Sequence, residues 1–105
     1  MKNMLDIMKQ AQKLQSRMAD MQAELEAAEV EGRAGGGLVT VAMSGKGEVK
    51  KVTIDPSLMK AEEREILEDL IVAAAADAKT KAESIAAEKM KSVTGGLPLP
   101  PGLGL

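Results

Sequence analysis

The chain has 105 residues, of which 45% are hydrophobic and 29% are charged, and its formal net charge is −2. This balance is typical of one soluble globular domain. The sequence contains no His, Cys, Phe, Tyr or Trp, so the common transition-metal ligands, the usual general base near neutral pH and the rings that stack on unpaired bases are missing. We therefore expect no enzyme, no cofactor, no metal site and no recognition of single strands.

The sequence also argues against a membrane protein. No stretch approaches 18 consecutive apolar residues, and the first ten residues carry charge in every helical turn, unlike a membrane span or a secretory signal peptide. We expect a cytoplasmic protein without a small-molecule substrate. Because a core without aromatic rings buries little apolar area in a chain of this length, we also expect the chain to form a homodimer.

Residues 2–28 are predicted to form one long helix. Apolar side chains recur at alternating spacings of three and four residues, which is typical of a helix that packs along one seam. At about 40 Å, this helix is longer than a compact domain needs, so part of it should pack on another helix or subunit. The apolar seam consists of Met4, Ile7, Ala11, Leu14, Met18, Met21, Leu25 and Ala28.

The middle of the chain is predicted to form an antiparallel sheet of three strands. Glycines at 32 and 35–37 break the helical pattern. Strands are expected at 38–43 and 48–54, joined by a turn, and a short first strand at 29–33. In an unbroken strand, Val49 and Val52 would fall on opposite faces, which predicts burial on both faces or a bulge.

A second long helix is predicted at residues 62–92. Asp55-Pro56 is typical of a helix start, with a short turn through Lys60 before the main helix. Four alanines at 73–76 should let another backbone approach closely, whereas the uncharged segment 95–105, rich in Pro and Gly, should be extended or disordered. The apolar stripe of this helix consists of Leu67, Leu70, Ile71, Ala74, Ala78, Ala82 and Ile85.

These elements define an α+β fold with the order α-β-β-β-α, a three-stranded antiparallel sheet and two long helices, assembled as a dimer. The folded domain is expected to span residues 1–94, followed by the tail at 95–105. The residues expected in the core or at the dimer interface are Leu38, Val39, Val41, Val52, Ile54, Leu67, Leu70 and Ile71.

Three other patterns have simpler structural explanations. The glycines at 32–37 and 45–47 lead into strands and lack the Ser or Thr of a phosphate-binding loop, so turns explain them better. Several of the eight methionines lie on the seam, where core packing explains them. The acidic pairs Glu62/Glu63 and Glu68/Asp69 lack a polarising partner, so exposed helix faces explain them better than acid–base catalysis.

The charges are distributed unevenly along the two helices. Residues 1–17 carry +3, residues 18–31 carry −5, residues 60–70 carry −3 and residues 77–91 carry +1. If the helices pack antiparallel, both basic ends should coincide away from the sheet and both acidic ends should lie near it. On charge alone, lysines that only solubilise exposed helices are the simpler explanation. The alternative is that a dimer displays two basic arms that straddle a DNA duplex. The candidate contacts to DNA phosphates are then Lys2, Lys9, Lys13, Arg17, Lys79, Lys89 and Lys91.

The stretch GGGLVTVAMSGKGEVKKVTIDPSLM (residues 35–59), followed by EREILEDLIVAAAADAK (residues 63–79), closely resembles the YbaB/EbfC family of bacterial nucleoid-associated proteins. The resemblance extends over nearly the whole chain. It implies a tight dimer with projecting helical arms, a double-stranded DNA partner, a place in the nucleoid, and effects on nucleoid organisation and gene expression. The alternative is a protein-binding adaptor whose helical arms grip another polypeptide.

Overall fold

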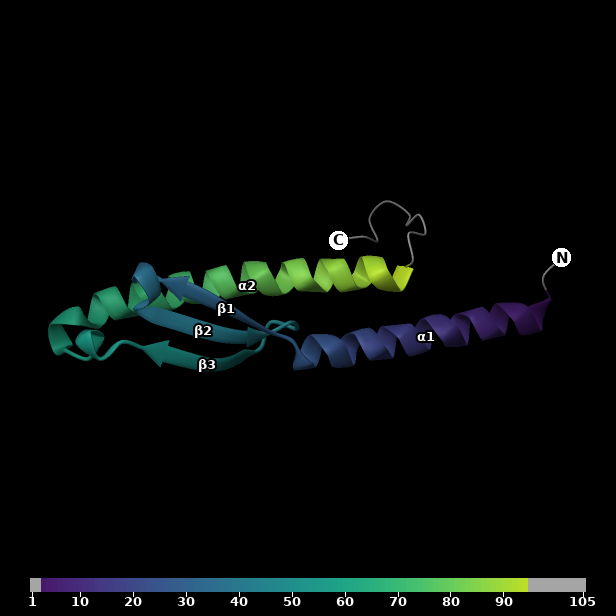
Figure 1. Ribbon diagram of the computed structural model, residues 1–105, viewed down its shortest axis with the longest axis horizontal. Coiled ribbons are helices and arrows are strands. Elements are labelled where there is room, and N and C mark those ends of the chain that lie inside the picture. The colour runs from purple at the N-terminus through teal and green to yellow at the C-terminus, as the bar shows by residue number, and fades with distance from the viewer. Residues whose placement is uncertain (1–2, 95–105) are drawn as a thin grey trace.

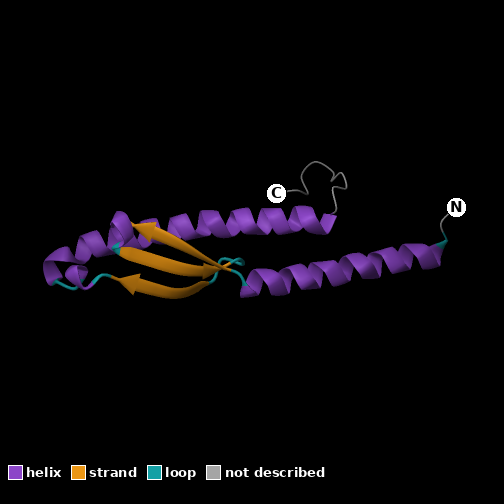
Figure 2. Ribbon diagram, in the orientation of Figure 1, coloured by secondary structure: helices purple, strands orange, loops and turns teal. Residues whose placement is uncertain are grey.

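The computed structural model describes residues 3–94 and shows a small sheet packed against one long helix, with a second long helix extending away from one end of the sheet (Figures 1 and 2). The strand order is β1-β2-β3, and both strand pairs are antiparallel. This architecture confirms the predicted α+β fold and its element order. The elements are α1 (Met4–Ala27), β1 (Glu29–Ala34), β2 (Val39–Ser44), β3 (Val49–Ile54) and α2 (Arg64–Thr94), with 3-10 turns at Gly35–Gly37, Pro56–Leu58 and Ala61–Glu63.

Helix α1 begins and ends close to the predicted residues. The Asn3 side chain caps its first turn by accepting a hydrogen bond from the Asp6 backbone N–H at 2.9 Å. The chain becomes extended at Ala28, where β1 follows directly. Lys2 and the tail at 95–105 lie outside the described residues.

The turn between β2 and β3 is fixed by one buried hydroxyl. Ser44 is fully buried, and its Oγ accepts hydrogen bonds from the backbone N–H groups of Lys46 and Glu48, each at 3.2 Å. The Gly45 N–H donates to the carbonyl oxygen of Leu25 at 2.8 Å. This turn therefore attaches the sheet to the last turns of α1.

A bulge in β3 brings Val49 and Val52, which would lie on opposite faces of an unbroken strand, to one face of the sheet. The register shifts between the Ala42–Lys51 pair and the Met43–Val49 pair, which leaves Lys50 as an extra residue. Val49 thereby lies opposite Met43, and Val52 lies opposite Val41, so Val49 and Val52 are on the same face of the sheet. Of the two alternatives that the sequence left open, burial on both faces or a bulge, the structure has the bulge.

Helix α2 packs against β1 at very short range because the facing residues are small. Ala74 and Ala78 are fully buried against the strand, and Ala82 is nearly so. A Cβ atom built on Gly32 would overlap the carbonyl oxygen of Ala74 and the backbone nitrogen of Ala78. The predicted close approach of another backbone to the alanine-rich helix is therefore present, and β1 is the element that makes it.

The core of the protomer lies between α2 and the first two strands. Its centre is aliphatic, and the partly buried side chains at its edge include most of the predicted stripe of α2. The buried members are Val30, Val39, Val41, Met43, Leu58, Ala74, Ala78 and Ala82, and those packed at the edge include Leu38, Ile54, Leu67, Leu70, Ile71 and Ile85.

Strand β3 is largely uncovered in the protomer, so of the two places expected for Val52, the core and the dimer interface, only the interface stays as a prediction. Figure 1 shows α2 lying over β1 and β2, with β3 beyond it. Val52 is 41% exposed and Val49 is 56% exposed, although Val52 pairs with the buried Val41. Val52 is therefore not part of the protomer core, because the helix that buries Val41 does not reach across the sheet.

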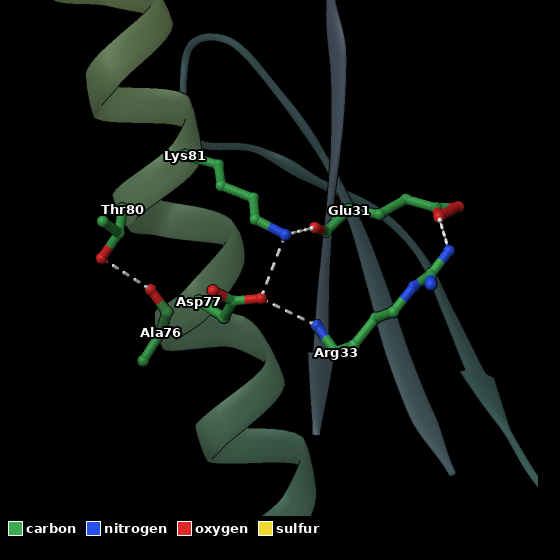
Figure 3. Close-up of polar contacts among 6 residues, drawn as sticks. All are labelled: Glu31, Arg33, Ala76, Asp77, Thr80 and Lys81. Atoms are coloured by element: carbon green, nitrogen blue, oxygen red, sulfur yellow. Dashed lines mark hydrogen bonds and ion pairs between the residues drawn. The ribbon is translucent and has the colours of Figure 1, made fainter. Parts of the chain in front are cut away.

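The outer edge of β1 is closed by two side chains of α2 (Figure 3). The backbone N–H of Arg33 donates to Asp77 Oδ2 at 3.0 Å, and Lys81 Nζ donates to the carbonyl oxygen of Glu31 at 2.8 Å. Asp77 and Lys81 also form an ion pair of 3.3 Å. A pair at this spacing is ordinary within a helix, whereas the two contacts with the backbone of β1 join residues far apart in the sequence.

Replacing Gly32 by valine should strongly destabilise the fold. The new side chain would meet backbone atoms of α2, which cannot rotate away, so the helix must shift from the sheet. We expect the free energy of unfolding in urea to fall by about 3 kcal/mol or more. The control is Glu29→Val at an exposed position of the same strand; an equal loss in both variants would show that the close approach does not matter.

Asp77 should make stability depend on pH. The Arg33 N–H and the Lys81 ammonium group hold the pKa of Asp77 below its ordinary value of 3.8. The resulting stabilisation is present above the ordinary pKa and is lost as pH falls through the lower pKa of the folded state. Asp77→Ala should thus unfold at lower urea concentration than the wild type near neutral pH, and the difference should shrink in strong acid.

The matched control for this prediction is Asp69→Ala, which removes an exposed carboxylate from the same helix. Urea unfolding of both variants is measured across the acidic range. A difference between Asp77→Ala and wild type that stays constant down to strong acid would contradict the proposed role of the charge.

Candidate nucleic-acid interface

The first half of α1 projects beyond the rest of the protomer as an arm. Figure 1 shows α2 ending alongside the middle of α1. The two helices meet through a small cluster of Met21, Leu25 and Val93. The protomer measures 71 × 25 × 16 Å and has a radius of gyration of 19.5 Å, compared with about 13 Å for a compact domain of 100 residues.

Three basic side chains lie along one face of α1. Lys9, Lys13 and Arg17 follow each other at intervals of four residues, so they share a face and span about 12 Å of helix. All three are exposed. Among residues 3–94, no carboxylate lies within ion-pair distance of them. We call this set the α1 basic stripe.

The basic end of α2 reaches only Arg17, the last cation of the basic start of α1, which corrects the expectation that the two basic ends coincide. Lys89 Nζ lies 3.7 Å from Glu24 Oε2, within the acidic half of α1. Arg17 lines a depression between the helices together with Asp20, Glu24 and Lys89. The helices are antiparallel as expected, but they are offset along their axes, because α1 must reach the sheet at its C-terminal end.

The two acidic segments lie at opposite ends of the sheet. The acidic end of α1 adjoins the β2–β3 turn, where Leu25 accepts from Gly45. The acidic start of α2 follows the far end of β3, after the turns at Pro56–Leu58 and Ala61–Glu63. Both segments are near the sheet as expected, but they do not form one acidic region.

The remaining candidate residues do not join the α1 basic stripe in one patch. Lys79 is exposed midway along α2, ten residues and therefore about 15 Å along the helix from Lys89. Lys91 is exposed in the last turns of α2. Lys2 precedes the described residues. Among the candidates in the described part of the chain, only the α1 basic stripe forms a continuous row on the arm.

A second group of cations was not singled out from the sequence. Lys46 lies in the β2–β3 turn, and Lys50 and Lys51 lie on β3; all three are exposed. The charge pattern of the two helices does not include these residues, and the strands are recognised in the sequence by their apolar pattern. The adjacent lysines at the bulge were the signal that could have identified this group.

Two carboxylates near the sheet and at the start of α2 make local contacts. Asp55 caps the turn after β3 by accepting from the Ser57 N–H at 3.0 Å, and its hydrogen bonds to Ser57 lower its pKa. Glu68 is exposed and forms a 3.9 Å pair with Arg64. Within residues 3–94, no three metal-binding side chains come together, and no helix is long and apolar enough to cross a membrane.

Comparison with known proteins identifies the family. The model of the YbaB/EbfC DNA-binding family matches residues 1–97. The chain belongs to this family. A relative named nucleoid-associated protein from Rhodopseudomonas palustris (strain TIE-1) is 63% identical over 105 residues, which are 100% of this chain and 99% of the relative. A relative of the same name from Nitrobacter hamburgensis is 62% identical, with the same coverage of both chains.

The architecture is also found in a solved structure. An uncharacterized protein from Helicobacter pylori superimposes with a TM-score of 0.73, covering 91% of this chain and 97% of that chain. The two sequences are 20% identical, so the likeness concerns the fold alone.

Proposed function

We propose that this member of the YbaB/EbfC DNA-binding family is a nucleoid-associated protein that binds double-stranded DNA as a homodimer. The observation that carries the proposal is the α1 basic stripe on a projecting arm. Its ammonium and guanidinium groups are exposed and have no ion-pair partner within the described residues. Family membership and the names of the relatives support the same role.

The proposed mechanism is electrostatic clamping of the phosphate backbone. Lysine and arginine side chains that neutralise phosphates release counterions, which supplies affinity without regard to sequence. The positive end of the α1 dipole adds to the attraction at the tip of the arm. With Arg17 as the one side chain of the stripe that can pair with guanine in a bidentate manner, little sequence preference is expected.

The other candidate cations are expected to contribute less to DNA binding than the α1 basic stripe. Lys89 already pairs with Glu24, so its contribution to a phosphate contact should be smaller than that of Lys9 or Lys13. Lys79 and Lys91 would contact DNA that extends along α2. Lys2 would extend the stripe toward the start of the chain.

We infer that the homodimer forms through the open edge of the sheet. An edge strand presents a row of backbone N–H and carbonyl groups that can pair with another strand. Side chains of α2 occupy such groups on β1, whereas β3 is exposed along its length. Val49 and Val52 add an uncovered apolar strip beside that edge.

Antiparallel pairing of two β3 strands about Val52 fits this strip. Such a pair places Lys50 opposite Ile54 and Lys51 opposite Thr53, so no two lysines face each other directly. It would also continue the row from the buried Val41 through Val52 into the partner. The dimer would carry two arms, and two basic stripes can contact one duplex together.

The remaining features of the proposed role follow from DNA binding. A nucleoid-associated protein acts in the cytoplasm on the nucleoid, where it affects nucleoid organisation and gene expression. No catalysis and no cofactor are part of this proposal.

Reversing the charge of the stripe should abolish DNA retention. Lys9→Glu/Lys13→Glu changes the charge of each arm by −4, so like charges would repel the phosphates. In a gel shift with duplex DNA at low salt, we expect affinity to fall by at least about 100-fold. Wild-type affinity should itself fall steeply as salt rises to the physiological range.

The charge-matched control is Lys46→Glu/Lys60→Glu, which makes the same change in net charge at exposed positions at the two ends of the sheet. This variant should retain much of the wild-type affinity. Equal losses in the two variants would mean that net charge and not the arm determines binding. Capture of a protein partner independently of salt, without retention of duplex, would support the adaptor alternative instead.

Placing a charge at the open edge should separate the dimer. Val52→Asp would bring two carboxylates together at the proposed two-fold axis, in an apolar strip. We expect the mass in solution, measured by light scattering, to fall from that of two chains to that of one (11.0 kDa). Val72→Asp, at an exposed position of α2, is the control and should remain dimeric; a dimeric Val52→Asp variant would exclude this edge.

A further inference from the structure

The apolar seam of α1 is covered along only half of its length. Met21 and Leu25 are buried against the end of α2. Toward the start of the helix, the same seam is open: Leu14 is 49% exposed, Ile7 is 57% exposed and Met4 is 80% exposed. The open half of the seam, here called the distal seam, comprises Met4, Ile7, Ala11 and Leu14.

The chain leaves α2 at the boundary between the covered and open halves. Val93 is buried in the cluster with Met21 and Leu25, and α2 ends one residue later at Thr94. Ser92, Val93 and Arg17 line the same depression. Because α2 runs antiparallel to α1, a chain that continues in its direction passes over the distal seam.

The sequence after Thr94 has the composition of a segment that could cover this seam. Residues 95–105 (GGLPLPPGLGL) contain four leucines and three prolines and no charged side chain. The glycines at 95 and 96 allow a change of direction after the helix. The prolines restrict the backbone, so less conformational entropy is lost on binding.

The length of the segment also fits. Eleven residues span about 34 Å in a polyproline conformation. The distance along α1 from Arg17 to Met4 is about 20 Å. If the tail starts beside Arg17 and runs toward Met4 with these rises per residue, Leu99 would lie near Ile7.

We propose that residues 95–105 bind the distal seam of their own chain, with their leucines packed on Met4, Ile7 and Leu14. Burial of leucine and methionine side chains from water supplies the driving force. The covalent connection at Thr94 gives the segment an effective local concentration on the order of millimolar. A second copy of the chain would have to compete with this concentration for the same surface.

This docking leaves Lys9 and Lys13 of the α1 basic stripe accessible, whereas Arg17 lies beside the end of α2. Lys9 lies about 160° around the helix from Ile7, because each residue turns the helix by about 100°. A segment on the seam therefore covers the face away from the lysine. The proposal is thus independent of DNA binding, and each can fail without the other.

Cysteine cross-linking tests the contact directly, because the native chain has no cysteine. The pair Ile7→Cys/Leu99→Cys places one thiol on the distal seam and one in the tail. The control pair Lys9→Cys/Leu99→Cys places the first thiol on the opposite face of α1. Mild oxidation of the full-length chains is followed by non-reducing gel electrophoresis and mass spectrometry.

We expect the seam pair to form a disulfide within one chain at least roughly fivefold faster than the control pair, because only a docked tail holds the two thiols within bonding distance. Equal rates for the two pairs would overturn the proposal. A seam pair that forms mainly a disulfide between two chains would also overturn it, and would assign the distal seam to a second copy.

Hydrogen exchange provides a second test without cysteines. Replacing the tail leucines at 97, 99, 103 and 105 by serine removes the apolar contacts but keeps the length of the chain. Amides of residues 4–14 should then exchange roughly tenfold faster, whereas Val72→Ser should leave them unchanged. Unchanged exchange in the tail variant would overturn the proposal, as would protection of residues 4–14 that rises with protein concentration.

Discussion

The fold depends on the close approach of α2 to β1. Gly32 has no side chain, and the alanines at 74 and 78 present the smallest side chains that a helix can bring to a strand. At this separation, Asp77 and Lys81 reach the backbone of β1. The direction of α2 is thereby fixed relative to the sheet, which places Val93 against α1 and leaves the first half of α1 as an arm.

The sequence was sufficient to predict the local elements. Spacings of three and four residues predicted α1, and the glycines at 35–37 and 45–47 predicted the turns. The misfit between Val49 and Val52 predicted either burial on both faces or the bulge that the structure has. Each of these signals acts over a few residues. Side-chain periodicity and turn chemistry report such local preferences directly.

The placement of the elements was less predictable. The offset between the helices depends on the position of the sheet, so the charge pattern alone wrongly predicted that the basic end of α2 lies along the whole basic start of α1, when it reaches only Arg17. The pairing of Lys89 with Glu24 shows the actual register. Likewise, the alternation in β3 could not show that α2 stops short of Val52, because periodicity indicates a face and not what covers it.

The two edges of the sheet differ, because side chains of α2 contact the backbone of β1 whereas β3 is exposed, and this difference has a consequence for assembly. If both edges were open, β1 of one molecule could add to β3 of the next, and this head-to-tail addition could repeat without limit into a fibre. The Asp77 carboxylate and the Lys81 ammonium group obstruct the first of these edges. Assembly through β3 can then stop at two molecules, because neither molecule of the pair offers a second open edge for further growth.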